Sequence, residues 1–276
     1  MMEYEGMVRF AAFVFFLAAV GCWEVVAPRR RLVSRKTGRW LSNLGIMTLN
    51  TITLRLLFPA AAVGLAVTAE ARGWGLLNNW QLPPGPSIIV AVITLDFAIY
   101  LQHVMFHAVP AFWRLHMVHH ADLDFDVSTG VRFHTFEIIL SMLIKFAVVV
   151  TLGPPVLAVL IFEILLNATS MFNHGNIRIP LTIDRWLRWL VVTPDMHRVH
   201  HSIVKNETNS NFGFNLPWWD HLFGTYRDQP TAGHAEMVIG LEQFRDSRHL
   251  TLPWMLIQPF VADSGRYAIN KRGEKS

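Results

Sequence analysis

The hydrophobic positions of this chain gather into four long apolar regions, which predict an all-α integral membrane protein. A helix needs about 20 apolar residues to cross the hydrocarbon core of a bilayer. The first three regions each predict one such helix, whereas the fourth is too long for one and is interrupted by Gly153-Pro154-Pro155. This break predicts a hairpin that dips into the membrane and returns to its starting side, and two short crossings would give the same sidedness. The four regions are Met7–Ala27, Leu44–Ala69, Ser87–Phe106 and Ile138–Phe172.

Basic residues between the apolar regions predict how the chain is oriented. The loop between the first two regions carries six lysines and arginines, and the loop between the second and third carries only Arg72. Because cytoplasmic loops are enriched in these residues, we expect the first loop to face the cytoplasm beneath an inner or plasma membrane, with the N-terminus and the 70–86 loop outside. Glutamates precede the first region and arginines follow it, which is the wrong polarity for a cleaved signal peptide. The six basic residues are Arg29, Arg30, Arg31, Arg35, Lys36 and Arg39.

Composition agrees with a membrane location and excludes several other classes of protein. Hydrophobic residues make up 52% of the 276 positions and charged residues 16%, against roughly 25% charged residues in ordinary soluble domains. The net charge of +4 comes from residues beside apolar runs, so it indicates a membrane surface and no nucleic acid as partner. The single cysteine, Cys22, excludes a disulfide framework, a thiolate zinc site and an iron–sulfur cluster built by this chain alone.

We expect a single membrane domain over residues 1–276, because no linker or low-complexity segment interrupts the chain. Residues 1–86 would form N-terminal anchor helices, 87–230 a catalytic region, and 231–276 a C-terminal extension that ends in a polar tail. Tryptophans are frequent after Asn173, and Ile183–Val192 has a helical pattern of apolar residues. Tryptophan is typical of headgroup depth, so this helix is expected in the membrane interface, within a cytoplasmic helical cap that carries the histidine clusters.

Histidine is the abnormal residue of the chain, with 13 copies. Eight of them form three short clusters in which histidines recur three or four residues apart. Residues at that spacing share one face of a helix, and neutral imidazole is the commonest metal ligand, so each cluster predicts ligands aimed at one point. Single histidines are usually ordinary core or surface residues, as we expect for His221, His234 and His249. The clusters are His103-x-x-x-His107, His116-x-x-His119-His120 and His197-x-x-His200-His201, with His134 and His174 at the two ends of the apolar hairpin.

The number of clustered histidines predicts two metal ions. One zinc ion accepts three or four protein ligands, and a haem needs one or two axial ones, so these imidazoles are too many for either. The zinc-peptidase motif H-E-x-x-H is absent, because Val104 follows His103 and Met117 follows His116. Imidazole also suits copper and nickel, so ligand type by itself leaves the metal open.

Beyond the histidines, the stretch from Asp96 to Tyr226 resembles the fatty acid hydroxylase / sterol desaturase superfamily of membrane di-iron enzymes. The order of the clusters, with one histidine after the hairpin, is that of this superfamily. Thr135 stands where its R-x-H-P-x-E element has proline, and Phe212 stands where its closing N-Y-G signature has tyrosine. The matching segments are Asp96-Phe-Ala-Ile-Tyr100-Leu-Gln-His103, Arg132-Phe-His134-Thr-Phe-Glu137, Asn211-Phe-Gly213 and Trp219-Asp220-His-Leu-Phe-Gly224-Thr225-Tyr226.

This resemblance implies two iron ions held by histidine side chains. Its ligand positions fall on His103, His107, His116, His119, His120, His174, His197, His200 and His201, and His134 is expected as a further ligand or a neighbour of one. A metal-bound imidazole usually donates its other N–H to a carboxylate or carbonyl. The expected orienting partners are Asp96, Glu137, Asn173, Asn211 and Asp220.

The activity implied by the resemblance is oxidation of a lipid. A sterol, fatty acyl or alkyl chain would be hydroxylated or desaturated with dioxygen. Electrons would come from a separate reductase or electron carrier, because the chain has no nucleotide-binding glycine motif. The basic loop Arg29 to Arg39 would either dock an acidic carrier or anchor anionic headgroups. Two alternatives stay open: a membrane di-zinc hydrolase, and a non-catalytic protein that binds or transports metal.

Overall fold

The computed structural model describes residues 4–80, 82–261 and 263–270, and within these ranges the chain is all-helical. No strand forms in the described ranges, although isolated β-bridges join Pro28 to Ile177 and Ser202 to Ile239. The predicted fold class is therefore confirmed. The polar tail expected after Asn270 lies outside the described residues.

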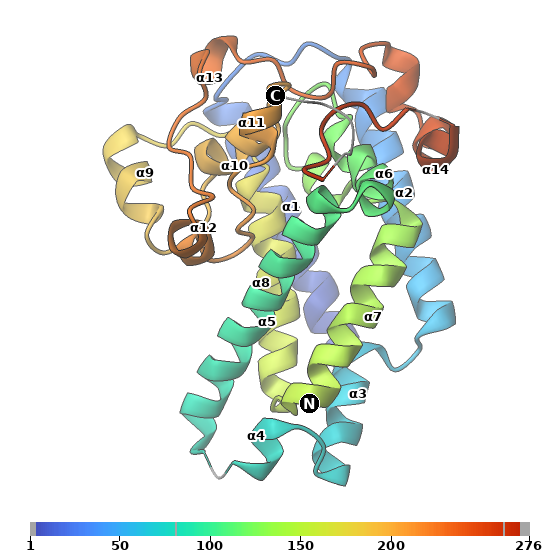
Figure 1. Cartoon of the computed structure of the whole chain (residues 1–276), viewed down its shortest axis with the longest axis vertical. Helices are drawn as coiled ribbons and strands as arrows, with labels where there is room; N and C mark the ends of the chain where they lie inside the picture. Colours follow the sequence, from blue (N-terminus) through green and yellow to red (C-terminus); the bar gives the residue numbers. More distant parts are fainter. Residues whose placement is uncertain (1–3, 81, 262, 271–276) are drawn as a thin grey trace.

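Five helical segments are long and apolar enough to cross a membrane, counting the described residues alone. They run roughly along the long axis of the molecule (Figure 1). The fourth apolar region of the sequence supplies two of them, so its four regions correspond to five segments. The segments are α1 (Glu5–Val26), α2 with α3 and α4 (Lys36–Leu57, Ala61–Arg72 and Leu76–Asn79), α5 (Pro84–Ala108), α7 (Thr135–Leu152) and α8 (Val156–Asn173).

Prolines interrupt the helices at the breaks that the sequence contains. Helix α2 ends at Leu57 and α3 begins at Ala61, because Pro59 has no N–H to donate and its ring crowds the preceding turn. Helix α7 ends before Gly153, which has a left-handed φ of 62°, and two prolines follow before α8 begins. The predicted second span is thus broken near its middle, and the fourth apolar region is divided into two helices at the predicted break.

The turn of this hairpin lies at the end of the molecule that also holds α4 (Figure 1). A Cβ atom on Gly75 would come within 2.1 Å of the backbone nitrogen of Gly153, so the contact requires glycine. Each hairpin helix has 18 residues, which corresponds to about 27 Å of rise. The hairpin therefore extends as far along the bundle as the 73–79 segment, and this favours two crossings over a shallow dip.

The opposite end of the bundle carries a helical cap, drawn at the top of Figure 1. The C-terminal extension belongs to this cap: Tyr267 is buried beside Trp113, and its backbone carbonyl accepts a hydrogen bond from Asn209. The cap consists of α6 (Pro110–His120), α9 (Leu181–Leu187), α10 (Pro194–His200), α11 (Lys205–Thr208), α12 (Trp218–Phe223), α13 (Gly233–Glu236) and α14 (Leu252–Val261), with 3₁₀ turns at η2 (Thr129–Val131) and η3 (Ser247–Leu250).

Two short cap helices expose apolar side chains beside the bundle. Helix α9 ends at Leu187, so it is shorter than the helix predicted over Ile183–Val192, and its Trp186 is 75% exposed. Helix α12 packs on span α5, where the rings of Phe97 and Phe223 stack with centroids 5.8 Å apart. These exposed faces lie where a span meets the cap, which is typical of helices in the membrane interface.

The basic loop between α1 and α2 is only partly a surface feature. Arg31 and Arg35 are exposed, but Arg39, in the first turn of α2, is 1% exposed. Arg29 is partly buried and forms a 3.0 Å ion pair with Asp195. The expectation that the whole loop forms an outer surface for headgroups or a carrier is therefore wrong for Arg39.

Candidate metal centre

All ten histidines expected as metal ligands are buried, and nine of them gather into two groups. Within each group, one ring nitrogen of every histidine lies within 4.8 Å of those of the other members. The described ranges contain no third group of histidine, cysteine or acidic side chains that is as close. The first group is His103, His107, His116, His120 and His200, and the second group is His119, His174, His197 and His201.

Each H-x-x-H-H cluster supplies ligands to both groups. In α6, His116 and His120 enter the first group, whereas His119 enters the second. The cluster at α10 does the reverse, because its middle histidine enters the first group and its outer two enter the second. Neighbouring residues of a helix point about 100° apart, while residues four apart share a face. Two adjacent histidines can therefore serve two separate ions.

Hydrogen bonds from Nδ1 atoms to carbonyl oxygens fix the tautomers of two histidines in the first group. The Nδ1 atom of His103 lies 2.8 Å from the carbonyl oxygen of Phe212, and that of His200 lies 2.7 Å from the carbonyl oxygen of Ser210. A carbonyl oxygen only accepts, so each Nδ1 donates and each neutral ring keeps its lone pair on Nε2. All five Nε2 atoms of the group are buried without a hydrogen-bond partner. The group therefore brings together five Nε2 atoms that have no hydrogen-bond partner.

The second group contains nitrogen contacts that need a cation. The Nε2 atom of His174 lies 3.1 Å from that of His119 and 3.2 Å from that of His201. The Nδ1 atoms of His119 and His174 face the carbonyl oxygens of Arg132 and Ser170, at 3.2 and 2.7 Å. Both rings therefore donate through Nδ1, and their Nε2 lone pairs point at each other when the rings are neutral. Such lone pairs repel unless a cation lies between them, so this donor set fits a metal ion.

Burial favours the neutral form of four histidines in the two groups. Loss of solvation, together with the neighbouring imidazoles, lowers the pKa of His119, His120 and His200 well below the ordinary value. Burial also lowers the pKa of His174, to about 3. A metal binds the unprotonated nitrogen, so these histidines are ready as ligands at neutral pH.

Glu137 contacts a histidine of the first group directly, as its expected role requires. Its Oε1 atom lies 2.6 Å from the Nδ1 atom of His116, and both side chains are buried. A carboxylate in this position orients the ring and raises the basicity of the other nitrogen. The Oε2 atom of Glu137 is buried without a hydrogen-bond partner.

Asp220 acts on the first group through a loop. Its carboxylate accepts hydrogen bonds from the backbone N–H groups of Phe212 and Gly213, both at 2.8 Å. It thereby holds the Phe212 carbonyl group to which His103 donates. Burial raises the pKa of Asp220 to about 6. The 209–213 loop is thus fixed by a carboxylate that touches no ligand.

Asp96, Asn173 and Asn211 also contact the loops of the C-terminal half and not a histidine side chain. Asp96 accepts a hydrogen bond from the indole N–H of Trp219 at 2.8 Å. Asn173 and Asn211 donate to backbone carbonyl oxygens. These residues connect the 211–219 segment to α5, α8 and α10, so the structure places them one contact further from the histidines than expected.

His134, the tenth expected ligand, lies outside both groups. It forms the N-cap of α7, where its Nδ1 atom accepts a hydrogen bond from the backbone N–H of Phe136 at 3.2 Å. Its Nε2 atom lies 3.2 Å from the carbonyl oxygen of Leu256. Both ring nitrogens are therefore used within the protein. Three other histidines also lie outside the groups, as expected: His221, His234 and His249.

The sequence did not predict some of the groups that accept hydrogen bonds from the histidines. Four of them are backbone carbonyl oxygens, of Arg132, Ser170, Ser210 and Phe212, which receive Nδ1 hydrogen bonds regardless of their side chains. Asn209 is a missed side chain, with its Oδ1 atom 3.0 Å from the Nδ1 atom of His107. Asn209 lies two residues before the Asn-Phe-Gly segment, and this position is the only feature of the sequence that could have indicated its role.

Half of the chain, residues 88–225, matches a sequence model described as fatty acid hydroxylase. All nine histidines of the two groups fall within this stretch. The chain belongs to the fatty acid hydroxylase family. The resemblance seen in the sequence is therefore confirmed, and helices α1 to α4 of this family member precede the matched region.

Named relatives of this family member modify lipids, according to their names. Ornithine lipid hydroxylase OlsE of Rhizobium tropici is 27% identical over 234 residues, which are 81% of this chain and 68% of that protein. Alkylglycerol monooxygenase of Xenopus tropicalis is 25% identical over 226 residues, 77% of this chain and 48% of that protein. The human alkylglycerol monooxygenase is 28% identical over 156 residues, 55% of this chain and 32% of that protein. The chain thus spans half or less of these monooxygenases, and no solved structure matches it.

Proposed function

We propose that this family member is a membrane-bound di-iron oxygenase that hydroxylates a lipid with dioxygen and electrons from a separate donor. The observation that carries this function is the convergence of nine buried imidazoles on two points, the first of which gathers five Nε2 atoms without a hydrogen-bond partner. The names of the relatives, a lipid hydroxylase and monooxygenases, support the reaction class. The names also favour hydroxylation over desaturation.

Two iron ions fit the two groups, one in each, and would supply the redox chemistry that activates dioxygen. The chain itself fixes the orientation of six of the nine rings through hydrogen bonds at Nδ1. It also excludes bulk water, since the nine histidines are at most 6% exposed. Glu137, beside His116, would balance part of the positive charge of the ions.

The position of the histidines supports a lipid as substrate. His103 and His107 lie in the last two turns of span α5, directly before α6 of the cap. The metal centre therefore lies where the apolar bundle meets the cap, and a lipid chain can approach it sideways from the bilayer. A substrate of this kind would not have to leave the membrane to be oxidised.

The two alternative functions have less support. Metal transport would favour ligands spread through the depth of the spans, whereas these histidines gather at one end of the bundle. A di-zinc hydrolase would suit the four histidines of the second group, but the five of the first exceed the usual tetrahedral set of zinc.

Metal analysis combined with lipid analysis tests the proposed function. Purified protein should hold about two iron ions per chain with nitrogen ligands, as measured by elemental analysis and X-ray absorption. Cells with the gene should contain a lipid with one added oxygen atom that is missing from cells without it. A zinc-loaded protein that cleaves a lipid without dioxygen would instead be a hydrolase. Metal binding with no lipid product under reducing, aerobic conditions would favour storage or transport.

We further propose that the metal centre faces the cytoplasm, because the arginine-rich loop and the histidines lie at the same end of the bundle. Reporter domains fused after Asn79 and after Asn206 test this orientation. The Asn206 fusion should report a cytoplasmic location and the Asn79 fusion an external one. A reversed result would overturn the orientation while leaving the chemistry of the site intact.

A further inference from the structure

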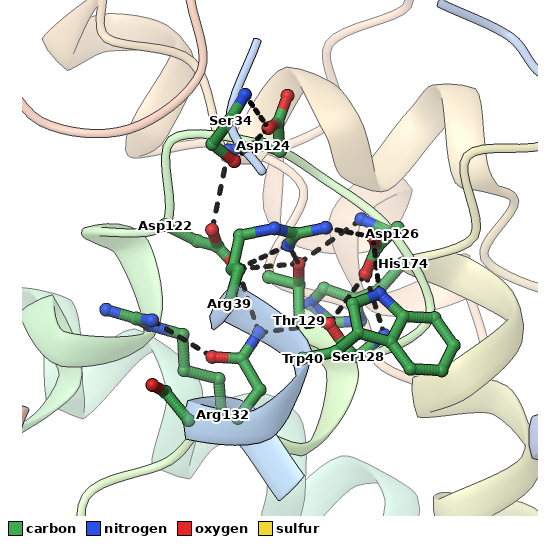
Figure 2. Close-up of polar contacts among 12 residues, drawn as sticks. Ser34, Arg39, Trp40, Asp122, Asp124, Asp126, Ser128, Thr129, Arg132 and His174 are labelled. Atoms are coloured by element: carbon green, nitrogen blue, oxygen red, sulfur yellow. Dashed lines mark hydrogen bonds and ion pairs between the residues drawn. The ribbon is translucent and has the colours of Figure 1, made fainter. Parts of the chain in front are cut away.

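Arg39 is a buried cation that ties the N-terminal helices to the cap. Its guanidinium group donates to Asp122 at 2.9 Å, to the hydroxyl of Thr129 at 3.3 Å, and to Asp126. Figure 2 shows this arginine among the acids and hydroxyls of the loop that follows α6. Trp40, the next residue of α2, also donates to Asp126, at 3.0 Å. Helix α2 therefore holds the loop from two neighbouring side chains.

The loop after α6 is buried and hydrogen-bonded along its length. Its residues 121–130 are all buried. Asn43, one turn after Arg39, donates to Asp122 at 3.2 Å and accepts a 3.0 Å hydrogen bond from Arg132. The hydroxyl of Thr129 donates to Asp122 at 2.9 Å. Residues 122–132, here called the acidic loop, thus pack on α2 through a continuous polar network.

The acidic loop ends at the histidines of the second group. The carbonyl oxygen of Arg132 receives the Nδ1 hydrogen bond of His119 at 3.2 Å. The carbonyl oxygen of Gly130 receives a 2.6 Å hydrogen bond from the hydroxyl of Ser170, whose own carbonyl oxygen holds His174 at 2.7 Å. A Cβ atom at Gly130 would come within 2.5 Å of the Ser170 carbonyl oxygen, so the two backbones are in tight contact. Two of the four ligands of the second group therefore depend on the position of this loop.

The first group rests on different supports. Its histidines His103, His107 and His200 donate to or contact the 209–213 loop, which Asp220 fixes. In the described hydrogen bonds, Arg39 makes no contact with that loop. Three of the five histidines of the first group are thus held by a loop that Arg39 does not contact.

We propose that Arg39 is a positioning residue for the second metal site. Through this residue, helix α2 would help to hold the ligands of the second group in place. This role rests on the proposed function, since it assumes one metal ion in each histidine group. Arg39 lies outside residues 88–225, the stretch that identifies the family. An arginine suits the position because its planar fork donates to two carboxylates from two separate nitrogens, whereas the donors of lysine all lie on one nitrogen. Loosening the acidic loop should therefore release the second ion and spare the first.

The test measures metal content in Arg39→Lys, a variant that keeps the charge and loses the fork. Purified wild-type protein should hold about two ions per chain and Arg39→Lys about one. Adding His197→Ala to the variant should remove no further metal, because the second site is already lost. Adding His200→Ala should remove nearly all that remains. This pattern assigns the lost ion to the second group, which a general loss of stability would not do.

A milder variant and a matched control complete the test. Thr129→Val keeps the shape of the side chain and removes the hydroxyl, so a chelator should extract one of the two ions faster than from wild type, even if Arg39→Lys fails to fold. The control is Lys145→Gln, which breaks a partly buried ion pair, the 2.8 Å contact with Glu163 between α7 and α8. It should keep both ions.

Three results would count against the role of Arg39. Two tightly held ions in both Arg39→Lys and Thr129→Val would show that the second site does not need the acidic loop in place. Loss of both ions together would show a general structural effect. Absence of metal from wild-type protein would overturn the proposed function itself, and the role of Arg39 with it.

Discussion

His200→Ala is expected to abolish activity and to lower the metal content from about two ions per chain to about one. The His200 ring lies centrally in the first group, with its centroid 4.6 Å from that of His103 and 4.7 Å from that of His107. Loss of a residue that merely orients a ligand weakens metal binding by about 10–100-fold. Loss of a ligand should cost more, and the proposed chemistry needs both ions. Elemental analysis and product assays on the same preparation give the measurement.

Two histidine variants serve as controls for His200→Ala. His221→Ala should keep both ions and full activity, because this ring lies outside the groups and stacks on Trp189 and Tyr226. His134→Ala should keep both ions but lower the stability of the protein by about 1 kcal/mol, the usual effect of losing a helix cap. A His134→Ala protein as poor in metal as His200→Ala would show that His134 is a ligand after all. An active, fully loaded His200→Ala protein would remove the first group from the mechanism.

The helices and the ligand set were predictable because both depend on local sequence. Apolar runs and proline breaks predicted the spans. The spacing of the histidines predicted eight of the nine that gather in the two groups, and the family resemblance added His174. The division of each H-x-x-H-H cluster between two ions also follows from helix geometry, since His119 and His120 point in different directions. The sequence therefore contains the information for this division, although the sequence analysis above did not predict it.

The supports of the ligands were not predictable because they come from distant segments. Asp96 lies two turns before His103 on α5, which suggested a direct contact, yet it holds the Trp219 indole instead. Arg39 was read as part of a surface loop, because a basic residue near a membrane is usually exposed. Its three acidic-loop partners are some 80 to 90 positions away. A single sequence shows no pairing over such separations, whereas a buried arginine demands it.

Sustained oxygen consumption by the purified protein is expected to require an added electron donor. Hydroxylation places one atom of dioxygen in the C–H bond and reduces the other to water, which takes two electrons and two protons from outside the lipid. The chain offers histidines for metal but only one cysteine, Cys22, and no nucleotide-binding glycine motif. Protein loaded with ferrous iron in detergent should therefore form at most one product molecule per metal centre and then stop.

Adding a reductase with a small electron carrier, or a chemical reductant, should convert this single turnover into continuous oxygen uptake with matching product. The measurement is an oxygen electrode trace alongside mass spectrometry of the lipid, with ¹⁸O₂ to show the source of the added atom. His200→Ala with the same donor is the control, since a reductant that consumes oxygen by itself will do so in its presence too. Continued product formation with neither donor nor dioxygen would mean that the lipid is hydrolysed or isomerised. The oxygenase assignment would then have to be abandoned, although the two histidine groups would remain a metal centre.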